Sequence, residues 1–123
     1  MARILVIDDQ AHIRTIINEF LTAERHEVDV AENGTDAMKL CGINDYDLVI
    51  TDLVMPHHDG FALIMSPKRQ DPPVKIIAMT GGTAMLDIGD LLDTSQLLGA
   101  DRVIAKPLDY IKLQAVVNEV LAA

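Results

Sequence analysis

The sequence predicts an α/β fold with a parallel sheet, and three observations support that prediction. Short apolar runs alternate with amphipathic segments along all 123 residues, which is typical of strands alternating with helices. The runs are almost continuous in Ile, Leu, Val and Ala, as expected when both faces of a parallel sheet are covered. Polar residues follow most of these runs, at the carboxyl ends of the predicted strands, and ligands bind at these ends in such folds. The length fits one domain.

The first half of the chain predicts three strands and two helices. Strands are expected at residues 3–7, 28–31 and 48–51. A second helix should begin after the turn signal Asn33-Gly34-Thr35. The first helix is indicated by apolar residues recurring at i, i+3, i+4, i+7 and i+8, namely Ile13, Ile16, Ile17, Phe20 and Leu21.

The second half predicts two further strands and three helices. Asp59 can cap a short helix through Met65, which Pro67 would break. Strands are expected at residues 74–79 and 103–105, and a helix at about 90–98, closed by Gly99. The last helix carries one apolar face made of Leu113, Val116, Val117, Val120 and Leu121.

Composition excludes several functional classes. Ten basic residues against nineteen acidic ones give a net charge of −9, which repels phosphate backbones, so nucleic-acid binding is not expected. The longest apolar run, Phe61–Met65, is far shorter than the roughly 20 residues of a membrane span, so no membrane association is expected. The single cysteine, Cys41, cannot form an internal disulfide and fits a reducing cytoplasm.

Chemistry-bearing side chains follow four of the five predicted strands. Asp8 and Asp9 follow the first strand and Asp52 the third. If the strand order is 2-1-3-4-5, these three carboxylates converge in one crevice. Clustered carboxylates repel one another, and a cation that occupies them relieves the repulsion. An all-oxygen, partly hydrated site favours Mg²⁺.

Asp52 has a second possible role in this pattern, because a carboxylate can attack phosphorus to form an aspartyl phosphate. Thr80 follows the fourth strand and Lys106 the fifth. The ammonium of Lys106 could neutralise a phosphoryl oxygen, and the hydroxyl of Thr80 could donate a hydrogen bond to another.

Four motifs, in order along essentially the whole chain, carry a family resemblance. They are Ile7-Asp8-Asp9, Asp52-Leu53-Val54-Met55-Pro56 with Asp59-Gly60, Met79-Thr80-Gly81 and Lys106-Pro107. With them the sequence resembles a response-regulator receiver domain of bacterial two-component signalling, of the stand-alone, chemotaxis-regulator-like type. The resemblance implies a flavodoxin-like (βα)5 fold, with a five-stranded parallel sheet in order 2-1-3-4-5 and helices on both faces. It implies one receiver domain over residues 1–123, with no output domain in the chain.

The resemblance also implies a function. Asp52 would accept a phosphoryl group from a sensor histidine kinase or a histidine phosphotransferase. Mg²⁺ would be bound by Asp9, Asp52 and the main-chain carbonyl of Val54, with Asp8 acting through water. The chain would be a cytoplasmic signalling protein and not an enzyme, with at most self-catalysed phosphotransfer and dephosphorylation. Its output protein would contact the surface of the fourth helix, fifth strand and fifth helix.

Several features depart from the family pattern. Val103 stands where many members carry an inward-swinging Tyr or Phe, so of the two switch positions, Thr80 and Val103, only Thr80 is expected to act in the usual way. The segment between Thr80 and Lys106 is about four residues longer than expected, which predicts an altered partner surface or a locally disordered loop. Pro67 should shorten the third helix. Val54 and Gly82 cannot orient a water molecule, which predicts a long-lived phosphoryl group.

Three other functions are alternatives to the hypothesis of a receiver domain. A small Mg²⁺-dependent phosphatase of the haloacid-dehalogenase type uses similar groups, but its nucleophile ends the first strand in an Asp-x-Asp motif, whereas this strand ends in Asp8-Asp9-Gln10. A flavin- or nucleotide-binding module needs a phosphate loop there, and this acidic segment would repel phosphate. A receiver-like scaffold that accepts no phosphate would usually lack one of the site residues.

Overall fold

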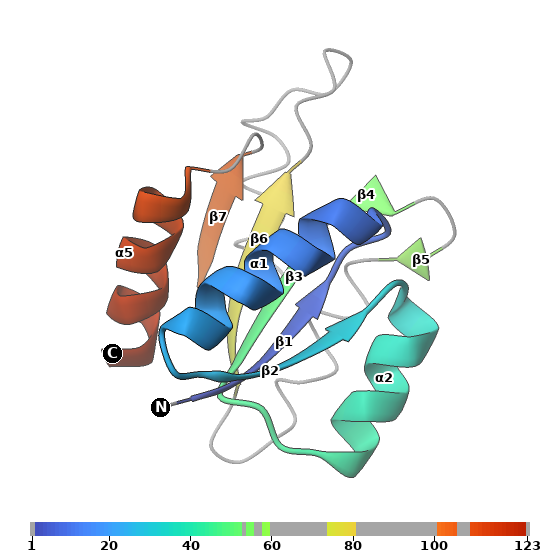
Figure 1. Cartoon of the computed structure of the whole chain (residues 1–123). Coiled ribbons are helices and arrows are strands. Elements are labelled where there is room, and N and C mark those ends of the chain that lie inside the picture. The colour runs from blue at the N-terminus through green and yellow to red at the C-terminus, as the bar shows by residue number, and fades with distance from the viewer. Residues whose placement is uncertain are drawn as a thin grey trace.

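The computed structural model describes residues 2–52, 54–55, 58–59, 74–80, 101–105 and 109–122. Within them, five parallel strands form one sheet in the order β2-β1-β3-β6-β7, which confirms the predicted order 2-1-3-4-5 (Figure 1). The strands are β1 (Arg3–Ile7), β2 (Glu27–Ala31), β3 (Leu48–Asp52), β6 (Lys75–Thr80) and β7 (Arg102–Ala105).

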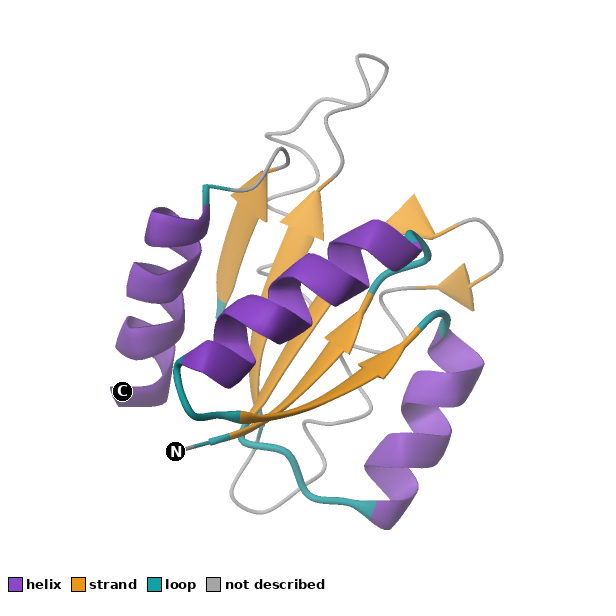
Figure 2. Ribbon diagram, viewed as in Figure 1, coloured by secondary structure: helices purple, strands orange, loops and turns teal. Residues whose placement is uncertain are grey.

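Three predicted helices are found, and they are distributed over both faces of the sheet (Figure 2). They are α1 (Ala11–Ala23), α2 (Gly34–Ile43) and α5 (Tyr110–Ala122). The helices predicted at 59–65 and 90–98, the break at Pro67 and the long segment 81–90 lie outside the described residues, except that Asp59 lies in an extended segment. None of the described helices has the length and hydrophobicity needed to cross a membrane.

Two short strands were not predicted. β4 (Val54–Met55) and β5 (His58–Asp59) form a two-stranded antiparallel sheet just beyond β3. Two-residue strands carry no measurable hydrophobic period, so sequence patterning cannot detect them. The pair follows directly on the strand that ends in Asp52, and it lies at the same edge of the main sheet as the strand ends (Figure 1).

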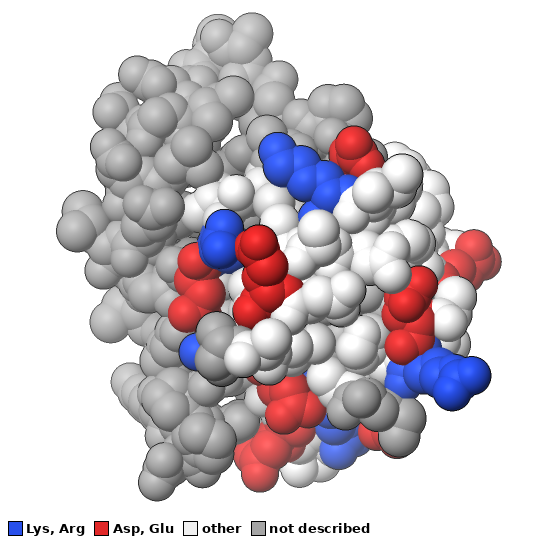
Figure 3. All heavy atoms as spheres, turned by 90° about the vertical axis from the view of Figure 1, so that its left-hand side faces the viewer, with Lys and Arg blue, Asp and Glu red and all other residues white. Residues whose placement is uncertain are grey.

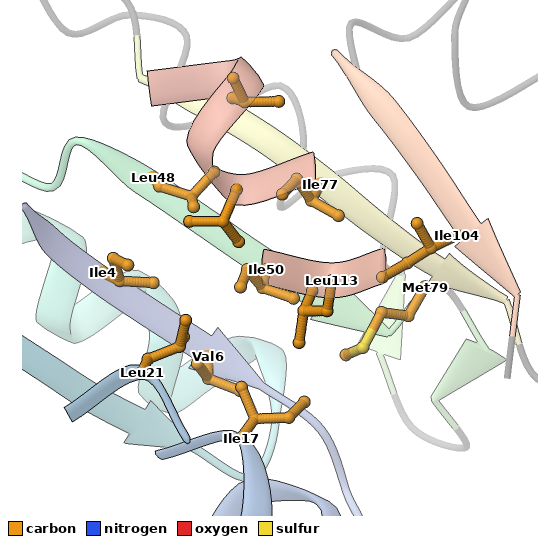
Figure 4. Packing of buried hydrophobic residues seen from close by; sticks show 12 residues of the cluster. Ile4, Val6, Ile17, Leu21, Leu48, Ile50, Ile77, Met79, Ile104 and Leu113 are labelled. Carbon is orange, nitrogen blue, oxygen red and sulfur yellow. The ribbon is translucent and has the colours of Figure 1, made fainter. Parts of the chain in front are cut away.

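Alternation along the strands divides the interior into two apolar layers. Successive side chains of a strand point to opposite faces, so Ile4 and Val6 pack with α1 and α5, whereas Leu5 and Ile7 pack on the side of α2. Figure 4 shows the first layer, in which Ile17 and Leu21 of α1 face strand residues, with Leu113 of α5 nearby. Cys41 packs against the second layer, and burial raises the pKa of its thiol.

Local signals fix the ends of the first two helices. Asn33 is the N-cap residue of α2, at the predicted start signal, and its side-chain oxygen accepts a hydrogen bond from the Asp36 N–H at 2.8 Å. The C-terminal end of α1 closes in a Schellman motif. In it the N–H of Arg25 donates to the carbonyl of Thr22, and the N–H of His26 donates to the carbonyl of Leu21. Arg25 adopts φ 69° there, a left-handed conformation.

A polar network ties the chain together at the amino edge of the sheet. The buried Tyr46 hydroxyl donates to Asp29 at 2.7 Å and accepts from the Asn44 amide at 3.3 Å. The guanidinium of Arg3 donates to the Asn44 oxygen at 2.9 Å and lies over the Tyr46 ring. Close by, the Ala2 N–H donates to Nδ1 of His26. This edge of the sheet is opposite to the carboxyl edge, where Asp8, Asp9 and Asp52 lie.

Candidate functional site

Three carboxylates meet at the carboxyl edge of the sheet. Asp8 and Asp9 follow β1, and Asp52 is the last residue of β3. β1 and β3 are neighbours in register, with Ile7 opposite Thr51, so the two strand ends lie side by side. One oxygen from each carboxylate lies within 4.8 Å of the other two. The predicted convergence of Asp8, Asp9 and Asp52 is therefore found.

The environment of these acids is unequal. Asp8 is 0% exposed and Asp52 is 4% exposed, whereas Asp9 is open to solvent. Burial of two carboxylates beside a third is unfavourable unless positive charge compensates them. Their oxygen atoms form the hard donor set that Mg²⁺ prefers. The residues present therefore fit a divalent cation at this position.

Asp8 is held at its main chain and its side chain. Its N–H donates to the carbonyl of Ala31 at 3.2 Å, which extends the ladder between β1 and β2 by one residue. Its carboxylate accepts a hydrogen bond from the Gln10 N–H at 2.9 Å, as in an Asx-turn. Its carbonyl accepts a hydrogen bond from the guanidinium of Arg14 at 2.8 Å.

Asp52 is held by the strand to which it belongs. All five residues of β3 are buried, because this central strand is covered on both faces. Asp52 lies opposite Met79 in the neighbouring strand β6. The hydroxyl of Thr51 donates to the main-chain carbonyl of Asp52 at 3.2 Å. The acid thus projects from a rigid element to the sheet edge.

The remaining predicted site residues are only partly described. Thr80 ends β6, directly after the partner of Asp52, and lies opposite Ala105. Val54 belongs to β4, two residues beyond Asp52. Val103 in β7 is half-buried and packs against the apolar layer on the side of α2. Lys106 lies outside the described residues.

Two residues beside the cluster were missed by the sequence analysis. Gln10 contributes a main-chain N–H and Arg14 a side chain, and both bind Asp8. Arg14 is a half-buried basic residue on an otherwise ordinary amphipathic helix. The position of Arg14 in the helix does not predict a hydrogen bond to a carbonyl six residues earlier. The only sequence signal is a basic residue near the start of a helix that follows two adjacent acids.

Comparison with known proteins agrees with this geometry. The family model of the response regulator receiver domain matches residues 4–118. Sporulation initiation phosphotransferase F of Bacillus subtilis is 31% identical over 97% of this chain and 93% of that protein. A probable transcriptional regulator, ycf27, of Porphyridium aerugineum is 36% identical over 97% of this chain but 48% of that protein.

Solved structures resemble the chain over nearly its whole length. A response regulator receiver domain protein from Clostridium thermocellum superposes with a TM-score of 0.85 at 28% identity, covering 99% of this chain and 95% of that one. Chemotaxis protein CheY4 of Vibrio cholerae has the same fold, with a TM-score of 0.85 at 24% identity and 98% coverage of both chains.

Several relatives are longer proteins. The chain spans 24% of the transcriptional regulator NtrC of Rhizobium meliloti, to which it is 31% identical over 98% of its own length. It spans about half of other transcriptional regulators that it matches. The match over residues 4–118, the flavodoxin-like sheet order and the acidic cluster lead to one conclusion: the chain belongs to the response-regulator receiver family of two-component signalling.

Proposed function

We propose that this receiver domain, residues 1–123, accepts a phosphoryl group on Asp52 and thereby changes its affinity for a protein partner. The observation that carries the proposal is the position of Asp52: 4% exposed, at the end of the central strand, with oxygen atoms of Asp8 and Asp9 within 4.8 Å. The proposed donor is a phosphohistidine of a sensor histidine kinase or a histidine phosphotransferase, and the proposed place of the transfer is the cytoplasm.

The transfer conserves atoms and charge in a simple way. A carboxylate oxygen of Asp52 forms a bond to phosphorus while the phosphorus–nitrogen bond of phosphohistidine breaks, and the departing imidazole nitrogen keeps the electron pair. Asp8, Asp9, Asp52 and the main-chain carbonyl of Val54 are the groups that would hold Mg²⁺, which when bound supplies positive charge near the phosphoryl oxygens. Thr80, the last residue of β6, and Lys106, which follows β7 in the sequence, are proposed to bind the phosphoryl oxygens.

The rigidity of the site supports its proposed role. Phosphoryl transfer asks a protein mainly for positioning and for compensation of charge. The Asp8 carboxylate is fixed by the Gln10 N–H, and Asp52 is fixed within a buried strand. Asp9 remains open to solvent, which leaves a path for a donor to approach.

The output is proposed to be a contact between proteins. The predicted surface includes α5 and β7, and Figure 3 shows that acidic and basic side chains are interspersed on the side of the molecule that carries α5. Arg102 of β7 and Glu119 of α5 form an exposed ion pair of 2.8 Å across this surface. Thr80 is the proposed switch residue. Val103, half-buried and aliphatic, would follow its movement only by repacking.

Intact-mass spectrometry tests the proposal. The full chain is incubated with Mg²⁺ and acetyl phosphate, with an Asp52→Asn variant and a sample without Mg²⁺ as controls. One phosphoryl adduct is expected in the complete reaction and none in either control, because the amide is a far weaker nucleophile than the carboxylate. An adduct that persists in Asp52→Asn would overturn the assignment of Asp52.

The same experiment also measures the release of phosphate and the lifetime of the phosphoryl adduct. Release of phosphate without an accumulating adduct would contradict the long-lived phosphoryl group expected from Val54 and Gly82, and it would favour the phosphatase alternative. The lifetime of the adduct after removal of the donor measures this directly: decay within seconds contradicts the expectation, and persistence for many minutes supports it.

A further inference from the structure

We infer that Arg14 is a positioning residue for the acidic cluster: it holds the main chain of Asp8, and through it the carboxylates that are proposed to bind the cation. The inference rests on the proposed function and deepens it. Arg14 is not itself a ligand, since its guanidinium carries only hydrogen-bond donors.

The contact is specific and well formed. Nη1 of Arg14 donates to the main-chain carbonyl of Asp8 at 2.8 Å, a distance typical of a strong charge-assisted hydrogen bond. The side chain is half-buried, so it is not a freely solvated surface group. A guanidinium also has a planar, fixed arrangement of donors, which makes it suited to fixing a carbonyl in one orientation.

The carbonyl of Asp8 needs such a partner because the sheet stops there. The paired residues of β1 end at Ile7, opposite Ala31 of β2 and Thr51 of β3. The N–H of Asp8 still reaches the carbonyl of Ala31, but the residue then leaves the strand toward α1. Its carbonyl is at the bend that decides where the Asp8 and Asp9 side chains point.

Arg14 connects both ends of this bend. Its own N–H donates to the carbonyl of Gln10 at 3.2 Å, an i to i−4 bond of α1, while its side chain returns to Asp8. Gln10 is the N-cap residue of α1, but its side chain makes no capping hydrogen bond, and the first turn of α1 has no acidic residue. Among the described contacts, the bonds of Arg14 and of the Gln10 N–H to Asp8 therefore fix the loop between β1 and α1.

Positioning and simple electrostatics predict opposite results when Arg14 is replaced. Removing a positive charge beside a cation site should tighten cation binding, because repulsion between the guanidinium and the cation is lost. Removing a group that orients the ligands should weaken cation binding, by about 10-fold if it resembles other groups that support metal ligands from behind. The sign of the change therefore identifies the role.

The experiment measures the Mg²⁺ dissociation constant of the full, unphosphorylated chain by titration calorimetry at fixed ionic strength. Wild type, Arg14→Lys and Arg14→Gln are compared. The expected order of affinity is wild type, then Lys, then Gln, with Gln weaker than wild type by about 10-fold. Lys keeps the charge and a donor but not the planar fork, so it should recover part of the loss.

Arg102→Gln is the matched control. It removes the same charge from the exposed pair with Glu119, at the amino end of β7, and should leave Mg²⁺ affinity unchanged. Unfolding in the absence of Mg²⁺ is measured for every variant, so that affinities are compared only where the protein is folded. If Arg14→Gln does not fold, Arg14→Lys makes the same comparison, and it should bind Mg²⁺ more weakly than wild type.

Two results would overturn the inference. Equal affinity in all folded variants would show that Arg14 has no role at the cluster, and the tightest binding in Arg14→Gln would show an electrostatic neighbour only. Failure of the proposed function gives a different result: wild type itself would then show neither Mg²⁺ binding nor a phosphoryl adduct on Asp52, and both proposals would fall.

Discussion

The buried side chain of Tyr46 connects two other residues of the polar network at the amino edge of the sheet, Asp29 and Asn44, through its hydroxyl. It is 2% exposed, donates to Asp29 at 2.7 Å and accepts from Asn44 at 3.3 Å. Replacing it with Phe removes the hydroxyl and keeps the ring. We expect Tyr46→Phe to lower the free energy of unfolding at pH 7 by about 1–2 kcal/mol, because Asp29 and Asn44 lose a partner. Urea unfolding measures this change, and equal stability of the two proteins would contradict it.

The same residue predicts a dependence on pH. Burial, followed by the hydrogen bond to Asp29, raises the pKa of Tyr46 from 10.0 to about 12. The folded state then holds this proton more tightly than the unfolded state does, so the stabilisation is complete below about pH 10 and is lost as the pH rises toward 12. The difference in unfolding free energy between wild type and Tyr46→Phe should therefore shrink from pH 10 upward. If the unfolding free energies of the two proteins change in parallel with pH, the raised pKa of Tyr46 is contradicted.

Residues of the site differ in how far the sequence reveals them. Asp8, Asp9 and Asp52 were predictable because each follows a visible apolar run, and a strand end fixes the place of the residue beyond it. Arg14 was not, because its role depends on a side-chain conformation that brings it back to a carbonyl. No hydrophobic period encodes such a bond.

The turn between α1 and β2 is an element whose geometry conflicts with its sequence. Arg25 occupies the left-handed position of the Schellman motif at φ 69°, where glycine is usual and a side chain costs about 1 kcal/mol. Arg25→Gly should therefore raise the free energy of unfolding, by up to about 1 kcal/mol after the greater freedom of the unfolded chain is offset. Thermal and urea unfolding test this, with Arg25→Ala as the control that removes the charge but keeps the Cβ. A glycine variant no more stable than the alanine variant would contradict the strain.

Elements were predictable where they are long and periodic. The first, second and last helices were found where their apolar residues or start signal predicted helices. Each of the five strands of the sheet was found within one residue of its predicted range, and β2 and β7 begin one residue earlier than expected. The pair β4 and β5 was missed, because its pairing depends on tertiary position and not on local pattern. The order of the strands came from the family resemblance, since five similar apolar runs do not identify their own neighbours.

The charge of the whole molecule predicts its response to salt. A net charge of −9 produces self-repulsion in the compact state that added salt screens. The described ion pairs, between Arg3 and Asp29 and between Arg102 and Glu119, are exposed and should contribute little in return. Raising NaCl from low concentration to about 0.3 M should stabilise the protein by about 1 kcal/mol, or roughly 4 °C in melting temperature.

Chelator in every sample keeps divalent ions out of that comparison. A melting temperature that falls with NaCl would mean that favourable ion pairs outweigh the self-repulsion.

The acidic cluster adds a specific effect to this general one. In samples without chelator, Mg²⁺ should raise the melting temperature more than NaCl of equal ionic strength, because a ligand that binds only the folded state stabilises it.

The polarity of the sheet has a practical consequence for handling the protein. The described chain begins and ends at the amino edge, with Ala2 before β1 and Ala122 closing α5, while Asp52 lies at the opposite edge (Figure 1). A fluorophore, a biotin or a carrier attached near either of these residues would therefore sit a full strand length from the acids. An immobilised molecule would present Asp9 to the solution, so that phosphodonors and partner proteins could be flowed over it without the anchor obstructing them.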